Sequence, residues 1–214
     1  MKILSAAQRV YAEHGFRGAT TRRIAEVAGV NEVTLFRIFG GKDALLEEAI
    51  RPNATRREIA VLTDRPADPE AELTAWVGAQ LAFLRERRSL IRKAMSEIEE
   101  RPQFLPCIRE GPECAHRALS DYVAALVDRG WVDHSPDLGA AIAMLMGAVF
   151  GDAMGREMIP ENYPSPIEHA AGAYARLFLR AIGVRRRPAP STNGRTTAPA
   201  DGRRATHRSG TSPR

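Results

Sequence analysis

The residues that could perform covalent or metal chemistry are few in this 214-residue chain and do not converge on one site. The sequence has two cysteines and five histidines. No two histidines have the spacing of a metal site on one helix with an acidic partner. A nucleotide-binding glycine loop and a nucleophile elbow are absent from the sequence as well. We therefore predict no catalytic residue, no metal and no cofactor, and we do not expect an enzyme.

The cysteines, Cys107 and Cys114, are seven residues apart, so that one helical face could carry both. Gly111 and Pro112 lie between them and are expected to break such a helix. Two buried core thiols are the simpler interpretation, because free cysteine is among the most buried residue types. A redox switch is the alternative. So few cysteines form no disulfide framework, which favours a reducing, cytoplasmic location.

A different kind of chemistry is indicated by the segment Thr21–Phe39, which reads TRRIAEVAGVNEVTLFRIF. It predicts two short helices that cross closely at the small Ala25 and are joined at Gly29, a residue that tolerates positive φ. Polar side chains surround the N-terminal end of the second helix, which reads base edges in helix-turn-helix proteins. An ordinary helical hairpin that binds nothing is the alternative interpretation.

The rest of the sequence predicts helices and no alternating strand pattern, so the expected fold class is all-α. In the first third of the chain, we expect four helices. Gly15 stops the first, and the second is capped by Thr20 or Thr21 and ends at Ala28. The third is capped by Asn31 and ends near Phe39, and the fourth begins near Lys42 and bends at Pro52. The core of this part is expected to contain Ile24, Ala28, Val30, Leu35, and Ile38 or Phe39. Further helices are expected at Pro69–Glu86, Leu90–Glu100, Glu113–Trp131, Asp137–Ile159 and Ile167–Ile182, with a segment punctuated by Pro102, Pro106 and Gly111-Pro112.

The stretch GFRGATTRRIAEVAGVNEVTLFRIFGGKDALL resembles the TetR family of bacterial regulators over roughly residues 3–50. The resemblance implies an all-α homodimer with a variable ligand-binding body, usually a repressor. It also implies that Thr20 or Thr21 and Lys42 contact phosphates, and that Asn31, Glu32, Val33 and Thr34 face the major groove. Phe36 occupies a position where the family commonly has a tyrosine whose hydroxyl reaches a phosphate. Glu32 occupies a position where family members often have a basic or small polar residue. Arg22, Arg23, Arg37 or the C-terminal segment would then compensate, although a solvated surface role for each arginine is the alternative.

Charge and composition divide the chain into three parts. Residues 1–50 form the predicted helix-turn-helix DNA-binding domain and residues 51–184 a helical ligand-binding and dimerisation domain. Residues 185–214 carry eight arginines and one aspartate with almost no large apolar residue. Such a composition predicts a disordered basic tail. The tail either contacts DNA phosphates or is simply solvated.

Two features of the body predict its partners. Asp137–Ile159 and Ile167–Ile182 are rich in glycine and alanine, which favours close helix packing in a homodimer; packing within one chain is the alternative. The bulky apolar residues are core, or in part line a pocket for an unknown small apolar effector. The candidates for this pocket are Trp76, Phe83, Met95, Phe104, Tyr122, Met146, Phe150 and Met154. No apolar run reaches the roughly 20 residues of a membrane span, so no membrane partner is expected.

A dimeric regulator of this kind is expected to read a pseudo-palindromic double-stranded operator. An all-α enzyme or lipid-binding protein with an incidental N-terminal hairpin is the rival hypothesis. An architectural DNA-binding protein without a ligand is a third, and it would lack an internal cavity.

Overall fold

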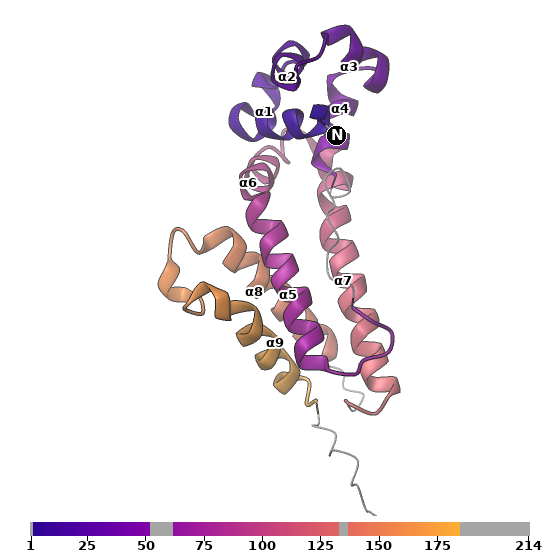
Figure 1. Ribbon diagram of the computed structural model, residues 1–214, viewed down its shortest axis with the longest axis vertical. Coiled ribbons are helices and arrows are strands. Elements are labelled where there is room, and N and C mark those ends of the chain that lie inside the picture. The colour runs from indigo at the N-terminus through magenta and orange to yellow at the C-terminus, as the bar shows by residue number, and fades with distance from the viewer. Residues whose placement is uncertain (1, 52–61, 133–136, 185–214) are drawn as a thin grey trace, which may run out of the picture.

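The computed structural model describes residues 2–51, 62–132 and 137–184, and within these ranges it contains helices and no strand (Figure 1). The all-α prediction is confirmed. The bend expected at Pro52 and the arginine-rich tail lie outside the described residues. The α-helices are α1 (Lys2–Gly18), α2 (Thr21–Ala28), α3 (Glu32–Phe39), α4 (Lys42–Ile50), α5 (Pro69–Glu86), α6 (Arg88–Ser96), α7 (Leu105–Asp128), α8 (Leu138–Gly155) and α9 (Ala170–Ala181). The 3-10 helices are η2 (Pro102–Phe104), η3 (Pro160–Asn162) and η4 (Ile167–His169).

Local sequence signals fix the beginnings of three helices. The Thr20 side chain caps α2 by accepting from the backbone N–H of Arg23 at 3.2 Å. The Asn31 side chain caps α3 by accepting from Val33 N–H at 2.9 Å. Asp68 does the same for α5, where proline occupies the first turn and loses no helical hydrogen bond. These starts agree with those predicted from the sequence.

The helices pack around two hydrophobic clusters. The head consists of α1 to α4, at the top of Figure 1, with the fully buried Val10, Ile24, Leu35, Leu45 and Leu46 at its centre. The body is formed by α5, α7, α8 and α9, whose core contains Leu73, Val77, Leu119, Leu126, Ala153 and Ala175. Helix α6, η2 and the start of α7 join the head's cluster through Leu90, Ala94, Phe104 and Cys107. The head therefore rests directly on the body.

Two helix breaks predicted from the sequence need correction. Gly15 does interrupt helical geometry, with φ +65° and ψ −174°, but helical hydrogen bonding resumes and α1 ends at Gly18. The break expected at Gly111-Pro112 is wrong, because α7 runs unbroken from Leu105 to Asp128 with Pro112 in its interior. A single proline removes one backbone donor, and burial of Cys107 and Leu119 on either side holds the helix together.

The cysteine prediction is only half right. Cys107 is buried in the cluster that α7 shares with the head, whereas Cys114, about two turns further along nearly the same face of α7, is exposed. The neighbours that cover α7 change along its length, so two residues on nearly the same face can differ in burial. No disulfide joins them in the structure.

The last two helices are shorter than predicted. Helix α8 ends at Gly155, where an added Cβ would lie 2.3 Å from the hydroxyl of Tyr163. Ile167–His169 form the 3-10 turn η4, so α9 begins only at Ala170. Among the described helices, α8 alone has the length and composition of a membrane span, yet it packs against α5 and α9 with a third of its residues buried. It is a helix of the body with one face uncovered.

The junction of α8 and α9 is held by a fully buried carboxylate, Asp152. It accepts hydrogen bonds from Arg85 at 2.9 Å, from Arg156 Nε at 2.7 Å and from the Tyr174 hydroxyl at 2.9 Å. Burial by itself raises the pKa of Asp152, but these hydrogen bonds outweigh it and hold that pKa below its ordinary value. Asp152 thus ties α5, α8 and α9 together.

Candidate nucleic-acid interface

Helix α3 presents an exposed face that its packing cannot explain. Val33 is 71% exposed, Phe36 49% and Ile38 55%, whereas Leu35 on the opposite face is buried. Of the two candidates for the small core, Phe39 packs against it and Ile38 does not. Apolar groups left in water on a short helix are typical of a contact surface, here one at the edge of the head.

The two helices of the motif are tied together at their N-terminal ends. The Thr21 hydroxyl donates to Glu32 Oε1 at 2.5 Å, and both residues are partly buried. Thr20, one residue earlier, is exposed. Its oxygen accepts the capping N–H, so its own hydroxyl proton remains available to an acceptor in solution. Of the two threonines proposed for a phosphate, Thr20 is the one whose hydroxyl is not already committed to a carboxylate.

The arginines of the head differ in their surroundings. Arg22 pairs with Glu26 at 3.1 Å on the exposed face of α2, and the Arg23 guanidinium donates to the carbonyl of Gly18 at 2.9 Å. Arg37 is exposed at the end of α3 and has no ion pair within the described ranges. Surface pairs such as that of Arg22 are weak, so phosphate could displace Glu26.

Lys42, the first residue of α4, lies against an aromatic ring rather than in open solvent. Its Nζ is 4.0 Å from the centroid of the Phe16 ring, and Arg101 Cζ lies 3.3 Å from the same centroid. Burial and the neighbouring Arg101 guanidinium lower the pKa of Lys42. Two cations therefore lie together at the start of α4. Arg101 was not predicted, because its proximity to the head arises only in the folded chain.

A carboxylate of the body holds α1 of the head in place. Both oxygens of Glu97, just after α6, accept from the backbone N–H of Phe16, at 3.1 and 3.2 Å. Lys93 Nζ lies 3.5 Å from Glu97 Oε1. The approach requires Gly15, since a Cβ there would lie 2.3 Å from that oxygen. On the other side, Arg87 donates to the carbonyl of Ile50 at 3.1 Å and so grips the end of α4.

Residues 3–49 match the family model described as bacterial regulatory proteins, tetR family. The chain belongs to the TetR family. Members of this family are DNA-binding transcriptional regulators and not enzymes, which agrees with the sequence prediction. They bind operator DNA as dimers.

Similar proteins extend the comparison beyond the head. The regulator YvkB of Bacillus subtilis is 25% identical over 188 residues, which cover 86% of this chain and 96% of the relative. The repressor AcnR of Corynebacterium glutamicum is 31% identical over 96 residues, 41% of this chain and 50% of that protein. The crystal structure of a TetR-family regulator from Mesorhizobium loti superposes with a TM-score of 0.70 at 23% identity, and the match covers 86% of this chain and 96% of that one. Its likeness supports the fold.

The body of this TetR-family protein contains a cavity of about 490 Å³ between α5, α6, α7 and α8. Ile50 at the end of α4 also contributes to its wall. Helix α6 lines it with Ile91, Ala94 and Met95, and the turn after α6 lines it with Ile98. These residues are next to Glu97, which holds α1, and to Lys93, which pairs with Glu97. One short helix therefore contacts both the cavity and the head.

The structure brings together only part of the pocket predicted from the sequence. Trp76, Phe83, Met95, Met146 and Phe150 all line the cavity. Phe104 lies outside it, in the head's cluster, where its ring contacts Tyr11 and Phe16. Tyr122 also lies outside, buried in the body core with its hydroxyl donating to Glu72 at 2.7 Å, and the Met154 carbonyl accepts from Arg92 at the far end of α8. Bulk and apolarity identify core and pocket residues alike, so the sequence could not separate them.

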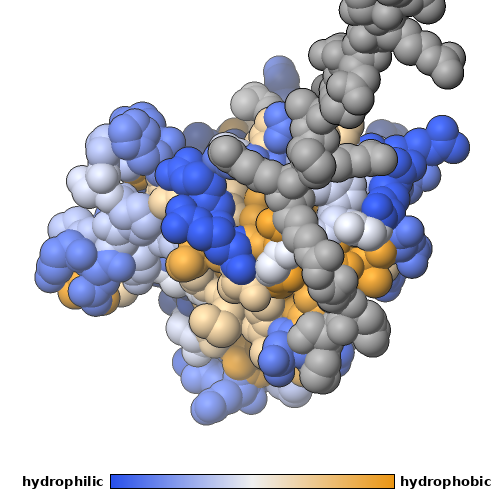
Figure 2. Space-filling model, turned by 90° about the horizontal axis from the view of Figure 1, so that it is seen from below, coloured by the Kyte–Doolittle hydropathy of each residue, from blue (hydrophilic) through white to orange (hydrophobic). Residues whose placement is uncertain are grey.

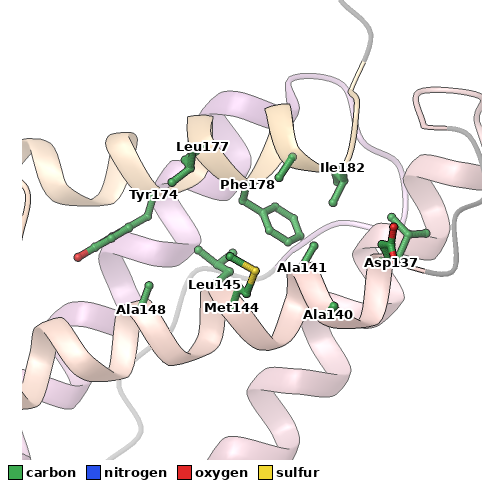
Figure 3. Close-up of a pocket in the computed structure, with 12 residues that line it drawn as sticks. Asp137, Ala140, Ala141, Met144, Leu145, Ala148, Tyr174, Leu177, Phe178 and Ile182 are labelled. Carbon is green, nitrogen blue, oxygen red and sulfur yellow. The ribbon is translucent and has the colours of Figure 1, made fainter.

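A second hollow lies on the surface between α8 and α9 (Figure 3). Its volume is about 360 Å³, and its floor contains Leu145, Phe178 and Ile182. On its rims stand Met144, 75% exposed, and Leu177, 66% exposed. Figure 2 shows hydrophobic side chains gathered at the centre of the lower end of the molecule, with hydrophilic ones around them.

Proposed function

We propose that this transcriptional regulator is a dimeric repressor that a small, mostly apolar ligand releases from its operator. The observation that carries the proposal is the cavity of about 490 Å³ whose α6 wall also holds the head. A ligand that pushes Ile91, Ala94 or Ile98 outward displaces Lys93 and Glu97, and with them Phe16. A ligand shifts the equilibrium only as far as it prefers the DNA-incompetent shape, and a tenfold loss of DNA affinity needs about 1.4 kcal/mol of such preference.

Residues at the exposed edge of the head are proposed to contact DNA. Asn31, Val33 and Thr34 at the start of α3 would face base edges, with Phe36 and Arg37 one turn further along. Thr20, Arg22 and Lys42 would approach phosphates. Thr21 and Glu32 would act mainly by holding α2 and α3 at a fixed angle through their hydrogen bond, in place of the direct contacts that the resemblance implies.

The uncovered face of α8 and α9 is proposed to form the dimer interface. Met144 and Leu177 would be buried by the same groove of the second protomer, since a two-fold interface pairs a surface with itself. Met144→Glu and Leu177→Glu should then give monomers in light scattering at micromolar concentration. Met158→Glu changes a methionine that is 70% exposed outside the groove, and it should leave the dimer intact. A monomeric unmodified chain would contradict the proposal.

The test of ligand control starts from an operator selected out of random duplexes. Apolar metabolites are screened by thermal shift, and those that raise the melting temperature are added to the protein–operator complex. Release of DNA at concentrations that saturate the protein is the expected result. Binders that fill the cavity and leave the complex unchanged would refute ligand control. They would instead favour a DNA-binding protein without an effector.

A further inference from the structure

The wall of the cavity contributed by α7 includes a backbone acceptor that its own helix leaves without a donor. In a regular α-helix, the N–H of residue 112 would donate to the carbonyl of Ile108. Residue 112 is a proline and has no N–H. This loss matters here because Pro112 lies inside α7, whereas Pro106 lies in its first turn, where no such bond exists.

The Ile108 carbonyl lies on the cavity side of α7. Ile108 and Pro112 both line the cavity, and so does Gly111, which has no side chain to cover the backbone. The oxygen of residue 108 points along the helix toward residue 112, within the strip of surface between these two residues. Outside the helix, no donor from the described parts of the chain reaches this oxygen. An apolar molecule that fills the cavity removes water from this carbonyl, and a carbonyl with neither water nor a donor is unfavourable, so a group that supplies a proton there gains binding energy.

The other polar residues that line the cavity indicate which charge a ligand can carry. Gln80 lines the wall from α5, and its side chain has no hydrogen-bond partner among the described residues. The described lining contains no carboxylate, while the guanidinium of Arg87 lies in the wall, 8% exposed. A cation entering this space would lose its hydration and meet a like charge. An uncharged molecule meets neither cost.

We propose that the effector is an uncharged, largely apolar molecule bearing a hydroxyl or N–H group that donates a hydrogen bond to the carbonyl of Ile108. This inference rests on the proposed function, because it names the ligand class of the same cavity. The apolar walls supply most of the affinity. The donor group decides which of several equally apolar molecules is selected, since a wrong partner leaves the carbonyl unpaired.

The test uses three probes with the same apolar body: 4-octylphenol, its methyl ether 4-octylanisole, and the 4-octylphenyl trimethylammonium cation. Affinities are measured on the full-length protein by quenching of tryptophan fluorescence, because Trp76 lines the cavity. The phenol should bind about two- to tenfold more tightly than the ether, the factor expected for one net hydrogen bond. The cation should bind more weakly than either.

Two proline variants identify the acceptor. Pro112→Ala restores the N–H that satisfies Ile108, so it should abolish the preference for the phenol over the ether, whatever it does to the affinity for both probes together. Pro106→Ala is the matched control in the same helix and should keep the preference. The inference is overturned if the preference survives in Pro112→Ala, if the ether binds as tightly as the phenol in the unmodified protein, or if no probe binds.

These outcomes are separate from those of the proposed function. Selective binding of the phenol without release of operator DNA would leave the ligand class standing and refute ligand control. Release of DNA by apolar molecules with and without a donor group would support ligand control and refute the proposed ligand class.

Discussion

The contact between Gly15 and Glu97 can be tested by adding a single methyl group. Gly15 combines φ +65° with ψ −174°, a conformation that is almost restricted to glycine, and it lies directly against the carboxylate that accepts from Phe16 N–H. Gly15→Ala therefore has two effects. It strains the backbone, and its Cβ would lie 2.3 Å from Glu97 Oε1, so the carboxylate must move away. The head should then lose its hydrogen bonds to Glu97, while the packing of Leu90 and Ala94 against it remains.

The size of each effect follows from the structure. Backbone strain in this region costs about 1–3 kcal/mol. Displacing the carboxylate removes hydrogen bonds to a charged group, which contribute about 1.5–3 kcal/mol. Glu97→Ala removes the same hydrogen bonds without strain. In the double variant they are lost only once, so we expect the combined destabilisation to fall short of the sum of the single changes by about 1.5–3 kcal/mol.

The assay is a double-mutant cycle of urea unfolding, followed by tryptophan fluorescence. Gly29→Ala is the control, because Gly29 also has a positive φ, +67°, but a Cβ there would meet no atom within 4 Å. It should cost about 1–2 kcal/mol for the left-handed conformation alone. It should also be additive with Glu97→Ala to within about 0.5 kcal/mol, as expected for sites that do not interact.

Additivity of Gly15→Ala with Glu97→Ala would refute the reasoning. The cost at Gly15 would then be backbone strain alone, and Glu97 would not be the contact through which α6 holds the head. A coupling of the expected size in both Gly15→Ala and Gly29→Ala would refute it as well, because it would reflect a general loosening of the head.

Three further predictions concern stability, DNA and the C-terminal segment. Because the folded pKa of Asp152 lies below its unfolded value, its contribution to stability is complete above the unfolded pKa and is lost as pH falls through the folded one. Asp152→Asn should therefore destabilise the protein by about 3 kcal/mol at pH 7 and flatten the acid limb of a stability–pH curve from urea unfolding, and an unchanged limb would contradict this. Lys42→Ala should weaken binding to every duplex and lower the salt slope by about 1, whereas Asn31→Ala should change the preferred sequence; fluorescence anisotropy at several salt concentrations distinguishes them. Deleting residues 185–214 should leave folding and dimerisation intact and reduce non-specific DNA affinity, and an unaltered salt slope would show that the eight arginines do not touch phosphate.

The sequence by itself determined what depends on neighbours along the chain. The caps Thr20, Asn31 and Asp68 bond to backbone groups two or three residues away, so their effect is readable without a fold. Helix α5 begins and ends at the residues predicted, Pro69 and Glu86. The same short-range logic predicted the helix-turn-helix, since its turn at Gly29 and its capped helices occupy one continuous segment.

The tertiary structure decided everything that depends on residues distant in the sequence. The acceptor for Phe16 N–H is Glu97, 81 positions away in the sequence, and no local sequence pattern predicts this pair. The choice of Phe39 over Ile38 for the core, and of Phe83 over Phe104 for the cavity, depended on which neighbours arrive from other helices. Pro112 illustrates the reason most clearly. Local propensity predicts a broken helix there, but packing along the whole of α7 contributes more free energy than one missing hydrogen bond costs.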